Sequence, residues 1–183
     1  MLVALGFRAH SGWAAMVAVA GTIDAPRVLH RRRIVIADPG MPGSKQPYHA
    51  AEGLSFPAAE EAIRQAIESS QALAEEAISA EVKKLRAEGH KVTGCAVLTG
   101  SGRPLPELAK ILSAHPLIHT AEGVMFRQVL LWAAKKSRLA VLAVPEKSLD
   151  AESLQRIGSL GKLIGPPWTQ DQKYATVAAF NIL

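Results

Sequence analysis

The chain has 183 residues, a formal net charge of +5, 49% hydrophobic residues and 20% charged residues. This composition excludes an intrinsically disordered protein, and the longest apolar run, residues 13–21, is too short to span a bilayer. We therefore expect a single cytoplasmic domain over residues 1–183, with no membrane partner and with a basic balance that suits an anionic ligand.

The first half of the chain predicts three antiparallel strands followed by a long helix. Turn residues such as Ser11 and Gly12 separate the strand-like runs. The expected strands are Leu2–Arg8, Trp13–Ala20 and Arg27–Ala37. A loop rich in Pro and Gly, 38–56, precedes residues 57–88, where apolar residues recur at helical spacing. The predicted helix is acidic, so the excess positive charge lies on the other segments.

The second half alternates buried strands with helices. The strands Val92–Leu98 and Leu139–Val144 are continuous apolar runs, as is typical of parallel strands that helices cover on both faces. The expected helices are Leu105–Ser113, Ala121–Lys136, Asp150–Leu163 and one that starts at Thr169, where Thr169 and Gln172 have capping-box spacing. This order predicts an α/β fold with a mixed sheet, three antiparallel strands and then parallel strands, and helices on both faces.

The single cysteine, Cys95, lies within the apolar run 92–98 and has no partner for an internal disulfide. We expect it to be a small buried side chain rather than a nucleophile.

Three stretches of sequence point to a known superfamily. They read "VALGFRAHSGWAAMVAVAG", "HTAEGVMFRQVLLWAAKKSRLAVLAVPEKSL" and "GPPWTQDQKYATVAAF". With the order of elements, they resemble the first hairpin, the middle crossover and the last helix of the ribonuclease H-like superfamily, in particular its Holliday-junction resolvase branch. The chain also resembles a bacterial group without an assigned function that shares this pattern. The resemblance covers most of the chain and implies a ribonuclease H-like fold.

The resemblance also implies phosphodiester hydrolysis by two divalent cations, because hard cations need several carboxylate oxygens. The family holds them with acids on the first strand, the next parallel strand and the last helix. Here Arg8 stands at the first position, the next parallel strand ends in Thr99 and Gly100 without an acid, and only Asp171 matches. A guanidinium beside Asp171 would repel a divalent cation, so we predict a degenerate site with Arg8 within ion-pair reach of Asp171.

We expect the candidate site at the carboxyl ends of the central strands, where open α/β sheets bind ligands. The predicted ligand-binding residues are Arg8, His10, Gly100, Ser101, Gly102, Arg103 and Lys173. The glycine loop before a helix offers backbone amides to an anion, although a tight turn explains the same glycines. Arg8 is equally well explained by a structural ion pair.

A second set of residues is the candidate catalytic set: His119, Glu122 and Asp171. His119 and Glu122 suit general acid and base roles, and Glu122 would compensate for a missing carboxylate. Both are also explained by their place at a helix start. His49 would complete a metal set with His119 and Asp171, although a loop histidine is usually just solvated.

The basic run His30–Arg33 alternates between the two faces of its strand, so it cannot form one continuous stripe. It suits an edge strand that resists aggregation better than it suits nucleic-acid contact.

Two functions follow, and the sequence does not decide between them. The first is a domain that has lost the two-metal carboxylate site and binds a phosphate-containing ligand or nucleic acid through a basic cleft, without a cofactor. The alternative is a metal-dependent phosphodiesterase, nuclease or other hydrolase that uses His119, Glu122 and Asp171 with a divalent metal ion. A third, an interaction module that uses the acidic helix, also stays open, as does the oligomeric state.

Overall fold

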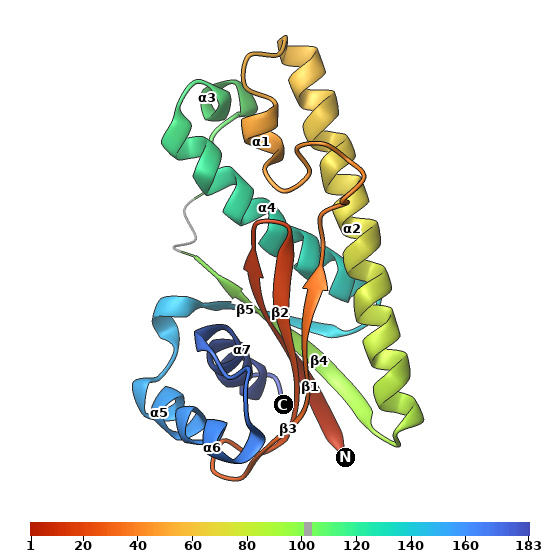
Figure 1. The fold of residues 1–183 in the computed structure, drawn as a ribbon, viewed down its shortest axis with the longest axis vertical. Coiled ribbons are helices and arrows are strands. Elements are labelled where there is room, and N and C mark those ends of the chain that lie inside the picture. Colours follow the sequence, from red (N-terminus) through yellow and green to blue (C-terminus); the bar gives the residue numbers. More distant parts are fainter. Residues whose placement is uncertain (101–103) are drawn as a thin grey trace.

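The computed structural model describes residues 1–100 and 104–183 and is built around a five-stranded sheet with the order β3-β2-β1-β4-β5 (Figure 1). The strands are β1 (Leu2–His10), β2 (Trp13–Gly21), β3 (Pro26–Val35), β4 (Lys91–Thr99) and β5 (Ala140–Pro145). The first three pair antiparallel, whereas β4 lies parallel to both β1 and β5. The predicted mixed sheet is confirmed.

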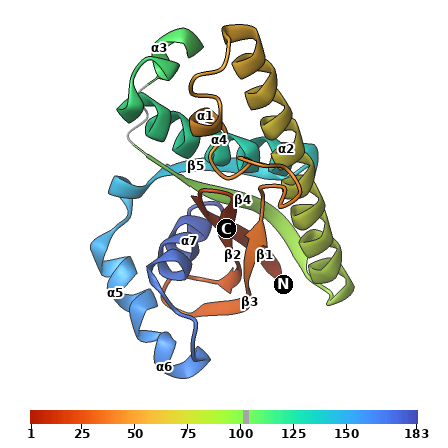
Figure 2. The same cartoon turned by 45° about the horizontal axis from the view of Figure 1, so that its top comes forward.

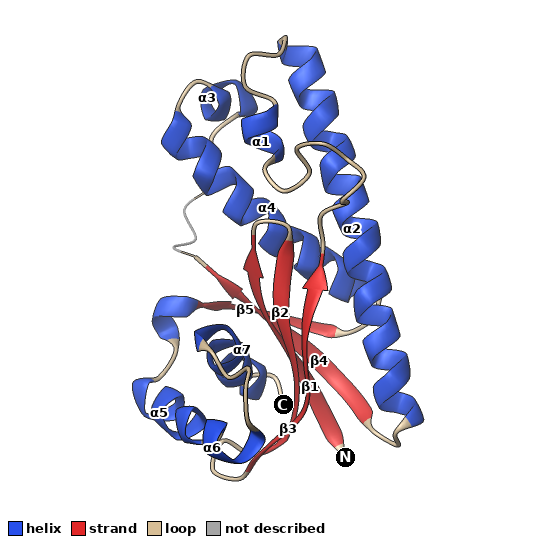
Figure 3. Cartoon of the chain, in the orientation of Figure 1, coloured by secondary structure: helices blue, strands red, loops and turns tan. Residues whose placement is uncertain are grey.

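Helices cover both faces of this sheet (Figure 3). The helices are α1 (Pro47–Ala50), α2 (Phe56–Ala87), α3 (Leu108–Leu112), α4 (His115–Lys136), α5 (Ala151–Ser159), α6 (Gly161–Ile164) and α7 (Gln170–Phe180), with a 3-10 turn at Glu146–Ser148. Figures 1 and 2 show α2 and α4 on one face and α5, α6 and α7 on the other. None of the described helices has the length and apolar character that crossing a membrane requires.

Two helix predictions need correction. Helix α4 starts at His115 rather than at Ala121, because Pro116 stands in its first turn, where a missing backbone N–H costs no hydrogen bond. The predicted break at His115 and Pro116 is therefore a helix start, which places His115 and His119 on one helix. The predicted helix 150–163 is divided into α5 and α6 at Leu160.

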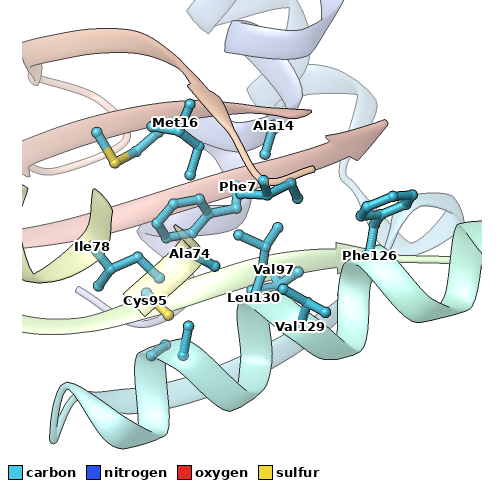
Figure 4. Close-up of a cluster of buried hydrophobic side chains, with 14 of the residues drawn as sticks. Phe7, Ala14, Met16, Ala74, Ile78, Cys95, Val97, Phe126, Val129 and Leu130 are labelled. Atoms are coloured by element: carbon cyan, nitrogen blue, oxygen red, sulfur yellow. The ribbon is translucent and has the colours of Figure 1, made fainter. Parts of the chain in front are cut away.

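The main core lies between the sheet and the helices α2 and α4. Figure 4 shows Phe7 of β1 and Val97 of β4 beside Leu130 of α4. Cys95 belongs to the same core, and burial raises the pKa of its thiol to about 12. Cys95 is therefore a buried, un-ionised side chain, in agreement with the prediction.

On the opposite face, α7 packs unusually close to β1. A Cβ built on Gly6 would lie 1.9 Å from the carbonyl oxygen of Ala175, so only glycine allows this approach. At its start, α7 has the predicted capping box, in which Thr169 and Gln172 satisfy each other's backbone N–H groups. Together these two features fix the first turn of α7, which carries Asp171, against the sheet.

The basic run on β3 makes structural contacts on both faces, as its alternation predicts. Arg31 donates hydrogen bonds to the carbonyl oxygens of Ile164 and Gly165 at the end of α6. His30 and Arg32 instead bind the buried carboxylate of Glu81 on α2. These side chains therefore hold the helices of both layers to the edge strand.

The close approach at Gly6 leads to a stability prediction. Gly6→Ala should lower the free energy of unfolding by roughly 1–3 kcal/mol, because the new methyl group collides with backbone rather than with a flexible side chain. Chemical denaturation measures this loss. The matched control is Gly158→Ala in α5, where a new Cβ meets no atom within 4 Å and alanine favours the helix. A Gly6→Ala protein as stable as the parent would contradict the packing described for α7.

Candidate functional site

The guanidinium of Arg8 lies between two carboxylates. Its Nη1 donates to Asp171 Oδ1 at 2.8 Å, while Nε and Nη2 donate to the two oxygens of Glu146 at 3.0 and 3.2 Å. Arg8 comes from β1, Asp171 from the first turn of α7, and Glu146 from the residue that follows β5. The predicted ion pair between Arg8 and Asp171 is confirmed, and Glu146 makes it a three-residue cluster, the Arg8 cluster.

The Arg8 cluster is half-buried and carries more negative than positive charge. The side chains of Arg8 and Asp171 are 17% and 19% exposed. Burial, the largest single effect, acts to lower the pKa of Arg8, but its hydrogen bonds and charge attraction to Glu146 and Asp171 together raise that pKa above its ordinary value. Arg8 therefore stays charged and neutralises only one of the two carboxylates.

Aromatic rings extend the Arg8 cluster toward the edge strand. His10 Nε2 donates to Asp171 Oδ1 at 2.9 Å, and the His10 ring stacks on Trp13 with centroids 4.2 Å apart. Arg33 lies 4.0 Å from the Trp13 ring centroid on β2. His10 thus joins Arg8 and Asp171, as predicted, and the stack of rings holds its imidazole against the carboxylate.

The loop that follows β4 is described only in part. Gly100 lies beside α4, where a new Cβ would meet Arg127 Nη1 at 3.0 Å, and both residues line a pocket of about 450 Å³. Ser101, Gly102 and Arg103, predicted to bind a ligand, lie outside the described residues. Lys173 follows Asp171 by two residues on α7 and has no ion-pair partner among the described residues.

The structure does not bring His119 and Glu122 to Asp171, and this corrects the expectation of one shared site. Both lie on α4, which packs on the sheet face opposite α7 (Figure 2). The buried carboxylate of Glu122 accepts hydrogen bonds from His49 at both Nδ1 (2.8 Å) and the backbone nitrogen (3.2 Å). The predicted sets of His119 with Glu122 and Asp171, and of His49 with His119 and Asp171, therefore do not form around a common point.

A histidine cluster takes their place. His49 of α1 lies beside His115 and His119 of α4, and one ring nitrogen from each lies within 4.8 Å of the others. Among the described residues, this is the group with the geometry to hold a transition metal ion.

Sequence reasoning missed two residues of these clusters, Glu146 and His115. Glu146 directly follows a parallel strand, the position where side chains of α/β sheets gather, so the rule that located the site also applies to it. His115 precedes His119 by four residues and would share its helix face, but the proline at 116 was interpreted as a break. Reading that proline as a first-turn residue would have revealed the pair.

With this geometry described, comparison with known proteins defines the class of the fold. No protein-family model and no curated protein matches the chain. Solved structures do match over nearly the whole chain, and they are of Holliday junction resolvases, so the chain has a ribonuclease H-like fold as predicted.

The structures in question are of RuvC from Thermus thermophilus. One, in complex with a Holliday junction substrate, matches with a TM-score of 0.57 and 13% identity over 98% of this chain and 91% of that chain. Another matches with a TM-score of 0.55 and 14% identity over 97% and 91%. At such low identity the likeness establishes the fold alone.

The Arg8 cluster predicts energetic coupling between its members. In a double-mutant cycle of Arg8→Met and Asp171→Asn, we expect a coupling free energy of roughly 1–2 kcal/mol, because Arg8→Met removes the guanidinium partner of the half-buried Asp171 and Asp171→Asn removes the charge that Arg8 Nη1 contacts. Denaturant unfolding of the four proteins measures it. The exposed pair of Arg64 and Glu68 on α2 is the control and should couple more weakly. Additive effects at Arg8 and Asp171 would show that their contact contributes nothing.

Proposed function

We propose that the chain is a ribonuclease H-like domain that binds nucleic acid and does not hydrolyse it by the two-metal route. The observation that carries this proposal is the guanidinium of Arg8 between Glu146 and Asp171. A positive side chain there occupies the space between the carboxylates that a divalent cation would need. The residues present therefore do not fit a pair of divalent cations.

Electrostatics support this reading of the Arg8 cluster. Compared with the two carboxylates alone, the guanidinium makes the site less favourable for a divalent cation about 4 Å away by about 8 kcal/mol, at an effective dielectric constant near 20. The cation would also have to replace three hydrogen bonds that Arg8 donates to the two carboxylates. Arg8 is attached to a central strand with its side chain 17% exposed, so it cannot withdraw without breaking these contacts.

The Arg8 cluster would assist the binding of a phosphate backbone without contacting the phosphates itself. Because Arg8 is already shared by two carboxylates, its role is to reduce the negative charge that would repel phosphates. Lys147 follows Glu146 in the sequence and Lys173 follows Asp171 by two residues on α7, so these two lysines are the candidates for phosphate contact. The net charge of +5 and the likeness to a resolvase structure solved with a Holliday junction support nucleic acid as the ligand.

The hydrolase alternative has less support. It requires His119, Glu122 and Asp171 to act on one substrate, and the two helices that carry them lie on opposite faces of the sheet. Glu122 is also occupied by His49.

DNA binding tests the proposal directly. The protein should bind a four-way DNA junction with an affinity that falls steeply as salt rises, and should leave it uncut in Mg²⁺ or Mn²⁺. The variant Lys147→Glu/Lys173→Glu should weaken binding by roughly tenfold or more in a mobility-shift titration. Lys83→Glu/Lys84→Glu on α2 changes the net charge equally at exposed positions of another layer and should have a smaller effect. Equal losses in both variants, or metal-dependent cutting by the parent, would contradict the proposal.

The Arg8 cluster also predicts a gain of metal binding. Arg8→Asp would place a third carboxylate beside Glu146 and Asp171, and three acids in reach of one another are the ligands that Mn²⁺ prefers. Calorimetric titration should detect Mn²⁺ binding to Arg8→Asp but not to the parent or to Arg8→Met. Binding of Mn²⁺ to the parent that Asp171→Asn abolishes would show that Arg8 does not replace a cation.

A further inference from the structure

Three histidine side chains lie close together on the side of the sheet opposite the Arg8 cluster. His115 and His119 lie one turn apart on α4, and their Nε2 atoms are 3.1 Å apart. The His49 ring, on α1, has its centroid 4.5 Å from that of His119 and 5.0 Å from that of His115. One potential ligand atom from each of the three lies within 4.8 Å of the others.

The hydrogen bonds around His49 fix which of its nitrogens is available. Glu122 Oε1 accepts a hydrogen bond from the backbone N–H of His49 and lies 2.8 Å from His49 Nδ1, so the contact suits the tautomer in which Nδ1 carries the proton and donates to this oxygen. The Nε2 atom then has a free lone pair. His115 repeats this arrangement more loosely, with Nδ1 3.6 Å from Glu52 Oε1. Carboxylates behind histidines in this manner orient metal ligands in many proteins.

The burial of Glu122 is a second indication. Its side chain is 4% exposed, and its only ion-pair partner among the described residues is His49. A buried carboxyl group needs hydrogen-bond partners, and His49 supplies them through its ring and its backbone N–H. His49 contacts Glu122 and its ring packs against the rings of His115 and His119, so the carboxylate and the three imidazoles form one connected arrangement.

The spacing of the imidazoles suits a small tetrahedral ion. Two nitrogens at about 2.0–2.1 Å from one Zn²⁺ with tetrahedral angles lie about 3.3 Å apart. The His115 and His119 nitrogens, at 3.1 Å, are close to this value. Imidazole favours Zn²⁺ and similar transition metals over Mg²⁺, which prefers oxygen.

We propose that His49, His115 and His119 bind one Zn²⁺, with Glu122 as the residue that orients His49. The side chain of His115 is 61% exposed, so the fourth coordination position is open to water. The ion ties α1, and with it the connection between β3 and α2, to the start of α4. This proposal does not rest on nucleic-acid binding, because the Arg8 cluster and the histidine cluster lie on different faces of the sheet.

The experiment uses the full chain without a histidine tag, stripped of metal by a chelator that is then removed. Calorimetric titration with Zn²⁺ should show one ion per chain, and saturating Zn²⁺ should raise the melting temperature. His119→Ala and His49→Ala should each weaken binding at least 100-fold and abolish the thermal shift. Glu122→Gln, which keeps all three ligands, should weaken binding roughly 10- to 100-fold.

Controls separate a specific site from general histidine binding. His90→Gln removes an imidazole outside the cluster and should bind Zn²⁺ like the parent. Mg²⁺ should give no thermal shift. His119 is exposed, so its alanine variant should keep the far-ultraviolet circular dichroism of the parent. A parent that binds no Zn²⁺, or a His119→Ala variant that binds it as tightly, would overturn the proposal and leave the histidines joined by an N–H···N hydrogen bond alone.

Discussion

One guanidinium, shared by two carboxylates, determines what the carboxyl end of this sheet can do. Arg8 donates hydrogen bonds to Glu146, which follows β5, and to Asp171 in the first turn of α7. These bonds join the central strand β1 to the end of an outer parallel strand and to a helix. The close approach of α7 to Gly6 and the capping box at Thr169 hold Asp171 at the required place. Where a pair of divalent cations would need a cluster of bare carboxylates, this chain has two carboxylates that are already paired with Arg8.

The Arg8 cluster and the histidine cluster lie on opposite faces of the sheet. The α7 face has a cation held between acids, with His10 and Trp13 beside it. The α4 face has a buried acid, Glu122, which contacts one of three neighbouring imidazoles. The Arg8 cluster already contains a cation, whereas the histidine cluster groups three potential ligands of a transition metal ion.

Much of the fold could be predicted from the sequence because burial leaves a clear pattern. The continuous apolar runs predicted the bounds of β4 and β5 to within two residues. The alternation of His30–Arg33 predicted which of these side chains lie on each face of β3. The contact between Arg8 and Asp171 followed from the resemblance. The rule for strand ends also points Glu146 to this edge of the sheet, but residue patterns could not predict its pairing with Arg8, because that contact requires β5 to lie beyond β4 and the side chain to reach across to β1. They also could not assign α4 and α7 to opposite faces, since helical periodicity shows which side of a helix is buried but not which side of the sheet covers it.

The most direct test of the central claim is a crystal structure of the protein grown with Mn²⁺ and a short DNA duplex, with anomalous scattering used to locate manganese. The account predicts the guanidinium of Arg8 between Glu146 and Asp171, with no anomalous peak within coordination distance of either carboxylate. A manganese peak bridging these two carboxylates, with Arg8 displaced toward solvent, would contradict it.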